Sequence, residues 1–146
     1  MDSWKAYGLT VIALFLKMFA TVLIQAYGRF KSNSFSNPED LAIVSNILGR
    51  KDAASSDDEL VRRAQNVLRN DGENIPIFLF LAMTYVQLNC WQTGVLIYFP
   101  LFVASRILHT VAYIRAIQPL RNIVYQVGIL VMFALCSHIG GKIWVS

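Results

Sequence analysis

The chain has 146 residues, of which 55% are hydrophobic and only 15% are charged, with a net charge of +4 at pH 7. A soluble domain of this length carries more charge and spreads it along the sequence, so this composition indicates a membrane protein. The basic residues are balanced by nearby acidic residues and lack interleaved aromatic residues, which excludes a nucleic-acid interface.

Four segments are long and apolar enough to predict membrane-spanning helices, which need about 20 mostly apolar residues. They cover residues 7–28, 74–93, 95–113 and 122–141. The first is expected to be retained rather than cleaved as a signal peptide, because no basic region precedes it and no small-residue cleavage site follows. The sequence therefore predicts an all-α membrane protein, a single domain over residues 1–146 built as a four-transmembrane-helix bundle.

The link over residues 29–73 contains two helix start signals. Asn37, Pro38 and two acidic residues predict a short helix near residues 38–48 that ends before Gly49. A capping-box pattern at residues 56–59 predicts that the second spanning helix begins near residue 57 and runs on to residue 93. Pro76 and, in the third segment, Pro100 are expected to bend their helices.

Orientation is predicted from the distribution of Lys and Arg. Most basic residues fall in the 29–73 link or flank the link between the third and fourth segments, as Arg115 and Arg121 do. The opposite side has only Lys5, Lys142 and an uncharged turn. Because positive residues favour the cytosolic side, both links are expected in the cytosol and both termini across the membrane.

Polar and ionisable residues cluster at or inside the ends of the apolar segments. Such groups are costly at membrane depth, so each needs a partner or a ligand. The clusters are Arg69, Asn70 and Glu73 before the second segment, Arg106, His109 and Tyr113 on one face of the third, and Arg121 with Tyr125 on the fourth. Lys17 lies in the middle of the first segment.

Each cluster also has a structural interpretation. Arg69 and Glu73, four residues apart, are spaced for an intrahelical ion pair. The stripe on the third segment is compatible with a hydrogen-bonded seam between helices, and Arg121 with an ordinary membrane-flanking cation. Lys17 has two open interpretations, a pair with a buried acid or a catalytic use. His138 is interpreted as structural, and Cys90 and Cys136 as packed or lipid-facing thiols without metal-ligand spacing.

Convergence of these groups at one depth favours a ligand site that faces the cytosol. Guanidinium groups suit carboxylates, a Glu and an Asn suit an ammonium or amide, and Tyr hydroxyls with Arg suit an anion. Glutathione carries carboxylates, an ammonium, amides and a thiol. An Arg or Tyr donor would lower the pKa of that thiol and present a thiolate to an apolar substrate arriving from the bilayer.

The chain resembles the family of membrane-associated proteins in eicosanoid and glutathione metabolism (MAPEG), in the branch of microsomal glutathione transferase 1 and microsomal prostaglandin E synthase 1. Four stretches in the family's order carry the resemblance. They are residues 35–40 (FSNPED), 69–75 (RNDGENI), 106–113 (RILHTVAY), and 119–121 (PLR) with Tyr125. The resemblance implies a homotrimer in the endoplasmic reticulum (microsomal) membrane, with glutathione bound between helices of adjacent subunits.

The resemblance also implies residue roles. Glutathione contacts are expected from Arg29, Arg69, Asn70, Glu73, Arg106, His109, Tyr113, Arg121 and Tyr125. Arg121 resembles the arginine that stabilises the thiolate, with Asp40 as its acidic companion. Asn122 stands where the prostaglandin synthases have a serine proposed to activate the thiol, and an amide can donate to sulfur without acting as a hydroxyl.

Three functions are consistent with these residues. The first is a glutathione transferase and peroxidase that acts on lipophilic electrophiles and lipid hydroperoxides, a detoxification role. The second is a glutathione-dependent isomerase that converts prostaglandin H2 to prostaglandin E2, which Tyr125 favours because the transferase branch tends to an apolar aromatic residue there. The third is a non-catalytic membrane scaffold that keeps the architecture.

Overall fold

The computed structural model describes residues 2–32, 42–43, 46 and 59–145. This part of the chain folds into long helices without a strand: α1 (Ser3–Ser32), α3 (Glu59–Gln87), α4 (Gln92–Ile114) and α5 (Gln118–Val145). The predicted all-α, four-helix fold is confirmed. Asp40 and most of the short helix expected near residues 38–48 lie outside the described residues.

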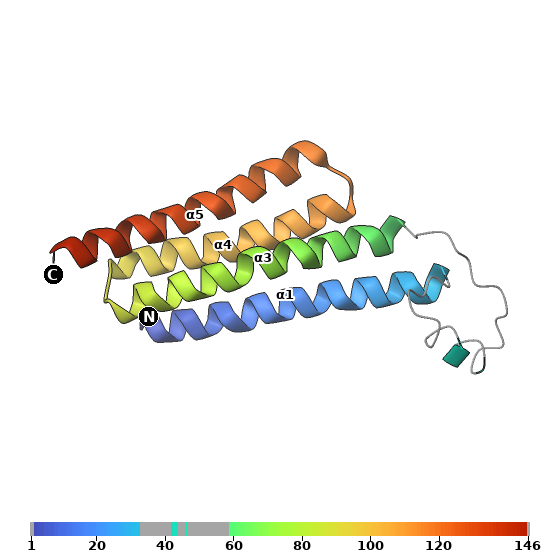
Figure 1. Cartoon of the computed structure of the whole chain (residues 1–146), viewed down its shortest axis with the longest axis horizontal. Coiled ribbons are helices and arrows are strands. Elements are labelled where there is room, and N and C mark those ends of the chain that lie inside the picture. The colour runs from blue at the N-terminus through green and yellow to red at the C-terminus, as the bar shows by residue number, and fades with distance from the viewer. Residues whose placement is uncertain (1, 33–41, 44–45, 47–58, 146) are drawn as a thin grey trace.

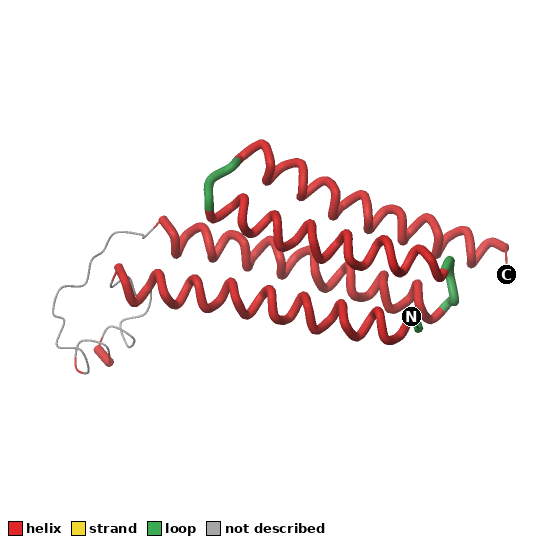
Figure 2. The backbone as a smooth tube through the Cα atoms, turned by 180° about the vertical axis from the view of Figure 1, so that it is seen from behind, coloured by secondary structure: helices red, strands yellow, loops and turns green. Residues whose placement is uncertain are grey.

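Consecutive long helices run antiparallel (Figure 1). The beginning of α1 and the end of α5 lie at one end of the bundle, and the α4–α5 turn lies at the other, near the start of α3 (Figure 2). α1 packs against α3 and α4, and α5 packs against the same two helices, whereas α1 and α5 make no contact within the described ranges. α3 and α4 therefore form the shared centre of the bundle.

Three of these helices, α1, α4 and α5, are long and apolar enough to cross a membrane by length and composition. α3 does not meet that criterion, although the sequence predicted four spans. Its first half carries charged residues as far as Glu73, and its apolar second half ends at Gln87 instead of continuing to Thr93. This composition keeps α3 below the criterion, and the span predicted over residues 74–93 stays a prediction.

A left-handed residue explains where α3 ends. Asn89 has a φ of 48°, and the amide of Cys90 donates to the carbonyl of Tyr85 at 3.2 Å. The α4–α5 turn repeats this arrangement, with Ala116 at a φ of 59° and the amide of Ile117 bonded to the carbonyl of Ala112 at 2.9 Å. Both are Schellman motifs, which satisfy the last carbonyl groups of a helix. The sequence predicted a link at both places, and the exact helix ends come from these left-handed residues.

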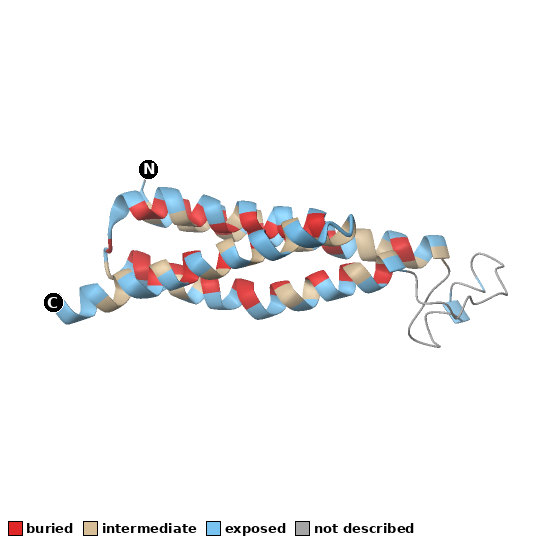
Figure 3. Ribbon diagram, turned by 90° about the horizontal axis from the view of Figure 1, so that it is seen from above, coloured by how far each residue is buried: buried red, intermediate tan, exposed pale blue. Residues whose placement is uncertain are grey.

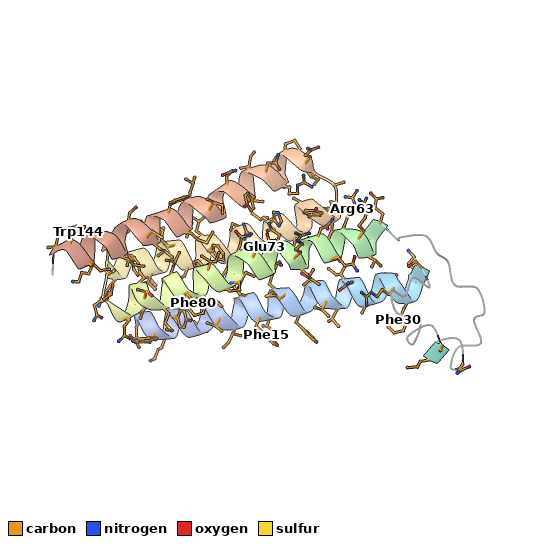
Figure 4. All side chains as sticks on the ribbon, in the orientation of Figure 1. Phe15, Phe30, Arg63, Glu73, Phe80 and Trp144 are labelled. Atoms are coloured by element: carbon orange, nitrogen blue, oxygen red, sulfur yellow. The ribbon has the colours of Figure 1, made fainter. Side chains whose placement is uncertain are left out.

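The apolar core lies toward the end of the bundle that holds the termini. Phe78 stacks on Phe102 with ring centres 3.7 Å apart, and meets Phe99 edge to face at 5.8 Å. Buried and exposed residues alternate along each helix (Figure 3). Large apolar side chains also project outward, as Phe15 and Phe80 do (Figure 4), which is expected where the surroundings are lipid.

Candidate functional site

Polar residues from three helices meet inside the bundle. Arg106 of α4 is fully buried, and its Nη1 donates to Oδ1 of Asn70 on α3 at 3.0 Å. Its guanidinium carbon lies 5.7 Å from the ring centre of Tyr125 on α5, a cation–π distance. His109 is buried, with its ring centre 5.7 Å from that of Tyr113 and 6.2 Å from that of Tyr125. We call Asn70, Arg106, His109 and Tyr125 the interior cluster.

The interior cluster has unused hydrogen-bonding capacity. Nε and Nη2 of Arg106 and Nδ1 of His109 are buried without a hydrogen-bond partner among the described residues. A buried polar group left unpaired costs about 1–3 kcal/mol, and more when it is charged. The guanidinium nitrogen atoms therefore suit a ligand that brings acceptor groups, an anion above all, whereas Nδ1 of His109 donates or accepts according to its tautomer.

Gly128 of α5 makes room for the guanidinium of Arg106. A Cβ atom at this position would lie 2.6 Å from Nη2 of Arg106 and 3.1 Å from Oγ of Ser105. The first of these distances is too short for a real contact. Sequence reasoning missed this residue, since a glycine within an apolar helix does not show which side chain it faces.

Two cavities open beside the interior cluster. One, of about 350 Å³, is lined by Asn66, Arg69, Asn70, Glu73 and Tyr113. The other, of about 250 Å³, is lined by Arg62, Arg63, Asn66, Ala112, Tyr113, Ala116, Gln118 and Arg121. Asn66 and Tyr113 line both cavities, so together they form one polar groove along α3 at the end of the bundle opposite the termini.

Arg69 and Glu73 lie on the outer side of this groove. Nε of Arg69 is 3.4 Å from Oε1 of Glu73, and the two side chains are 84% and 61% exposed. Figure 4 places Glu73 nearer the middle of the bundle than Arg63. The intrahelical ion pair that the spacing allows is thus present, and both side chains stay accessible to a ligand.

Arg121 and Tyr113 meet at the second cavity. The guanidinium carbon of Arg121 lies 4.8 Å from the ring centre of Tyr113, which holds the cation at the opening. Asn122, the next residue, is exposed and lines neither cavity. Asp40, the expected companion of Arg121, is outside the described residues.

Arg29, like Asn122, is a candidate that lines neither cavity of the groove and is not part of the interior cluster. It lies near the end of α1, a helix without contact to α5 in the described part of the chain. Its Nε is buried without a hydrogen-bond partner among the described residues.

Lys17 forms a buried ion pair with Asp71 of α3. Their side chains are only 5% and 0% exposed. The structure thus supports one of the two interpretations of Lys17, the pair with a buried acid. Asp71 had no assigned role, although a lysine in the middle of an apolar span is a signal that an acid must be near.

Arg63 also has a contact that the sequence did not predict, since it was counted only among the basic residues of the 29–73 link. Its Nη1 donates to the backbone carbonyl of Tyr113 at 3.0 Å, and its guanidinium also pairs with Glu59. Arg63 thereby ties the first turns of α3 to the end of α4. It fixes the wall of the groove next to Arg121.

The opposite end of the bundle holds the remaining His and a buried cysteine. Oη of Tyr98 and Nε2 of His138 are 3.1 Å apart, in a group of aromatic rings that includes Tyr85 and Trp91. Cys90 is buried, and its Sγ lies 3.9 Å from the carbonyl oxygen of His138. These contacts agree with structural roles for His138 and Cys90.

Comparison with known proteins adds a family match and named relatives. The model of the MAPEG family matches residues 7–141. Prostaglandin E synthase from Equus caballus is 32% identical over 124 residues, which cover 84% of this chain and 78% of the relative. Microsomal glutathione S-transferase 1 from Rattus norvegicus is 32% identical over 130 residues, which cover 86% of this chain and 79% of the relative. The protein of that name from Mus musculus is 34% identical over 113 residues, which cover 77% of this chain and 72% of the relative.

Proposed function

Because this chain belongs to the MAPEG family, we propose that it is a glutathione-dependent membrane enzyme in which the glutathione thiolate reacts with lipophilic electrophiles and lipid hydroperoxides. It would act as a transferase and a peroxidase. The observation that carries the proposal is the buried guanidinium of Arg106, which has two unpartnered nitrogen atoms and lies beside a groove lined by polar side chains.

The side chains of the groove fit the charged groups of glutathione. We assign Arg69 to a carboxylate, Glu73 to the ammonium group and Asn70 to an amide, because each offers the complementary charge or hydrogen bond. Arg106 has unpartnered N–H groups for further acceptors, and the unpartnered Nδ1 of His109 offers one more hydrogen bond. Tyr113 and Tyr125 would close the site with their rings and hydroxyl groups.

Arg121 is assigned to the sulfur. Bound glutathione supplies a nucleophilic thiol, and a guanidinium next to that thiol favours its ionised form. Arg121 stacks on Tyr113, which also lines the cavity that contains Arg69 and Glu73, so it lies at the same opening as the peptide-binding residues. Asn122 would add an amide donor, and Asp40 would act as the acidic companion of Arg121.

A homotrimer would complete the site. Arg29 does not reach the groove of its own chain, and its buried Nε has no partner among the described residues. In a trimer with glutathione between adjacent subunits, Arg29 would supply a carboxylate contact to a neighbouring protomer. Apolar side chains that project from α1, such as Phe15, would contact lipid or that neighbour.

We assign the protein to the endoplasmic reticulum membrane, with the groove on the cytosolic side. Among the described residues, Arg62, Arg63, Arg69, Arg115 and Arg121 lie at the groove end of the bundle, and the basic residues at the end with the termini are Lys5 and Lys142. Positive residues favour the cytosolic face. Water-soluble glutathione would then enter from the cytosol and the lipophilic substrate from the bilayer.

A glutathione-dependent prostaglandin E synthase is the second candidate. The specific observations that favour it are the similarity to prostaglandin E synthases and the tyrosine at position 125, whose ring faces both Arg106 and His109. Such an enzyme would isomerise prostaglandin H2 to prostaglandin E2 and regenerate glutathione.

Parallel assays on the purified protein test these proposals. In detergent with glutathione, we would measure conjugation of a chlorodinitrobenzene-type electrophile, reduction of a lipid hydroperoxide and isomerisation of prostaglandin H2. Conjugation and peroxide reduction without isomerisation support the first function, and efficient isomerisation supports the second. If glutathione at millimolar concentration does not bind, both proposals are refuted and a non-catalytic scaffold remains.

A further inference from the structure

The buried ion pair between Lys17 and Asp71 has no part in the function proposed above. It joins α1 to α3 inside the bundle, with both side chains almost completely shielded. Removing two charges from water costs several kcal/mol for each ion, and apolar residues often stabilise such a position better. A pair kept at this depth therefore calls for an explanation beyond stability.

The neighbourhood of Asp71 suggests what the pair does. Asn70, the preceding residue, accepts the hydrogen bond from Nη1 of Arg106. Asp71 itself lies within electrostatic range of Arg106. Asp71 on α3 is thus within electrostatic range of two cations, Lys17 from α1 and Arg106 from α4.

The balance of buried charge is uneven. The buried charged side chains that the structure describes are Lys17, Asp71 and Arg106, two cations and one anion. Asp71 engages Lys17 through Oδ2, whereas Oδ1 of Asp71 and Nε and Nη2 of Arg106 have no hydrogen-bond partner among the described residues. The carboxylate has therefore paired with the lysine and left the arginine side chain available.

We infer that Lys17 is a positioning residue that sequesters Asp71, so that the guanidinium of Arg106 stays free for an anionic group of the ligand. Without Lys17, the carboxylate of Asp71 would pair with Arg106, the other cation within its range. That new pair would compete with the ligand for the N–H groups of Arg106. This inference rests on the proposed function only in naming glutathione as the ligand.

Three variants test the inference through glutathione affinity. Lys17→Met should raise the dissociation constant for glutathione by roughly tenfold, the loss expected for one charge-assisted contact. Asp71→Asn should leave that affinity within about twofold of the original, because no carboxylate remains to bind Arg106. The double variant Lys17→Met/Asp71→Asn should recover the affinity lost in Lys17→Met. Lys5→Met, at the exposed start of α1, is the matched control.

Binding would be measured by equilibrium dialysis of radiolabelled glutathione against the full chain in detergent, beside the thermal unfolding midpoint of each variant. A purely structural pair predicts that Lys17→Met and Asp71→Asn lower affinity alike, and that result would overturn the inference. Unchanged affinity in Lys17→Met would also overturn it. Lys17→Arg keeps the cation and should keep the affinity for glutathione. If Lys17→Met does not fold, a loss of affinity in a folded Lys17→Arg/Asp71→Asn variant would overturn the inference instead. Absence of glutathione binding by the unmodified chain would instead refute the proposed function.

Discussion

At the scale of single residues, variants of Arg121 and Glu73 are expected to affect turnover and glutathione binding separately. Arg121→Ala should lower kcat by roughly tenfold or more while the KM for glutathione changes little, because the guanidinium is assigned to the sulfur anion that reacts. Glu73→Ala should raise that KM by roughly tenfold and keep kcat, because it removes a contact already made in the ground state. Steady-state kinetics with varied glutathione would measure both values.

Arg115 provides the control for this comparison. It is exposed in the α4–α5 turn and lines neither cavity of the groove, so Arg115→Ala should leave both constants unchanged. Full turnover by Arg121→Ala would show that the arginine does not stabilise the thiolate.

Gly128 offers a second test at this scale. A methyl group at position 128 would clash with Nη2 of Arg106, so Gly128→Ala should displace the guanidinium and weaken glutathione binding by roughly tenfold. Gly140→Ala is a matched control on the same helix, because nothing lies within 4 Å of a Cβ atom at Gly140. Equal affinities for the two variants, measured by equilibrium dialysis, would contradict the placement of Arg106.

At the scale of secondary-structure elements, the α4–α5 turn contains a strained residue. Ala116 has a φ of 59°, a left-handed conformation that costs a residue with a Cβ atom about 1 kcal/mol. Ala116→Gly should therefore raise the free energy of unfolding by up to about 1 kcal/mol, since glycine adopts this conformation without penalty. The thermal midpoint in detergent would report the gain, and a lower midpoint would argue against the left-handed turn.

The helices themselves were predictable because the apolar segments are long and their composition is unambiguous. The ends were not. Asn89 stops α3 through its backbone conformation, and a hydropathy count does not weigh the tendency of asparagine to adopt a positive φ after a helix. The predicted span over residues 74–93 counted residues 88–93 as part of the helix, whereas α3 ends at Gln87.

The same distinction applies to the candidate site. Spacing alone placed Arg106, His109 and Tyr113 on one face of a helix, and their contacts follow that pattern. The partners across helices were beyond sequence reasoning, because the match of Lys17 with Asp71 and of Arg106 with Gly128 depends on the packing of α1 on α3 and of α4 on α5.

At the scale of the whole molecule, the bundle divides into two ends. Aromatic rings pack toward the end with the termini, the buried cations Lys17 and Arg106 lie further inside, and the polar groove occupies the other end. An enzyme that joins a water-soluble peptide to a lipophilic substrate needs such a division, because one reactant enters from water and the other from lipid. The proposed homotrimer would extend the groove with residues of a neighbouring α1.

A structure of the protein with glutathione bound, in a lipid nanodisc, would locate the ligand directly. We expect the peptide in the groove of α3, with carboxylate groups on Arg69 and Arg106, its ammonium group on Glu73 and its sulfur near Arg121. Glutathione bound at the end with the termini, or a groove whose arginine side chains leave the ligand and face separate surfaces, would contradict this expectation.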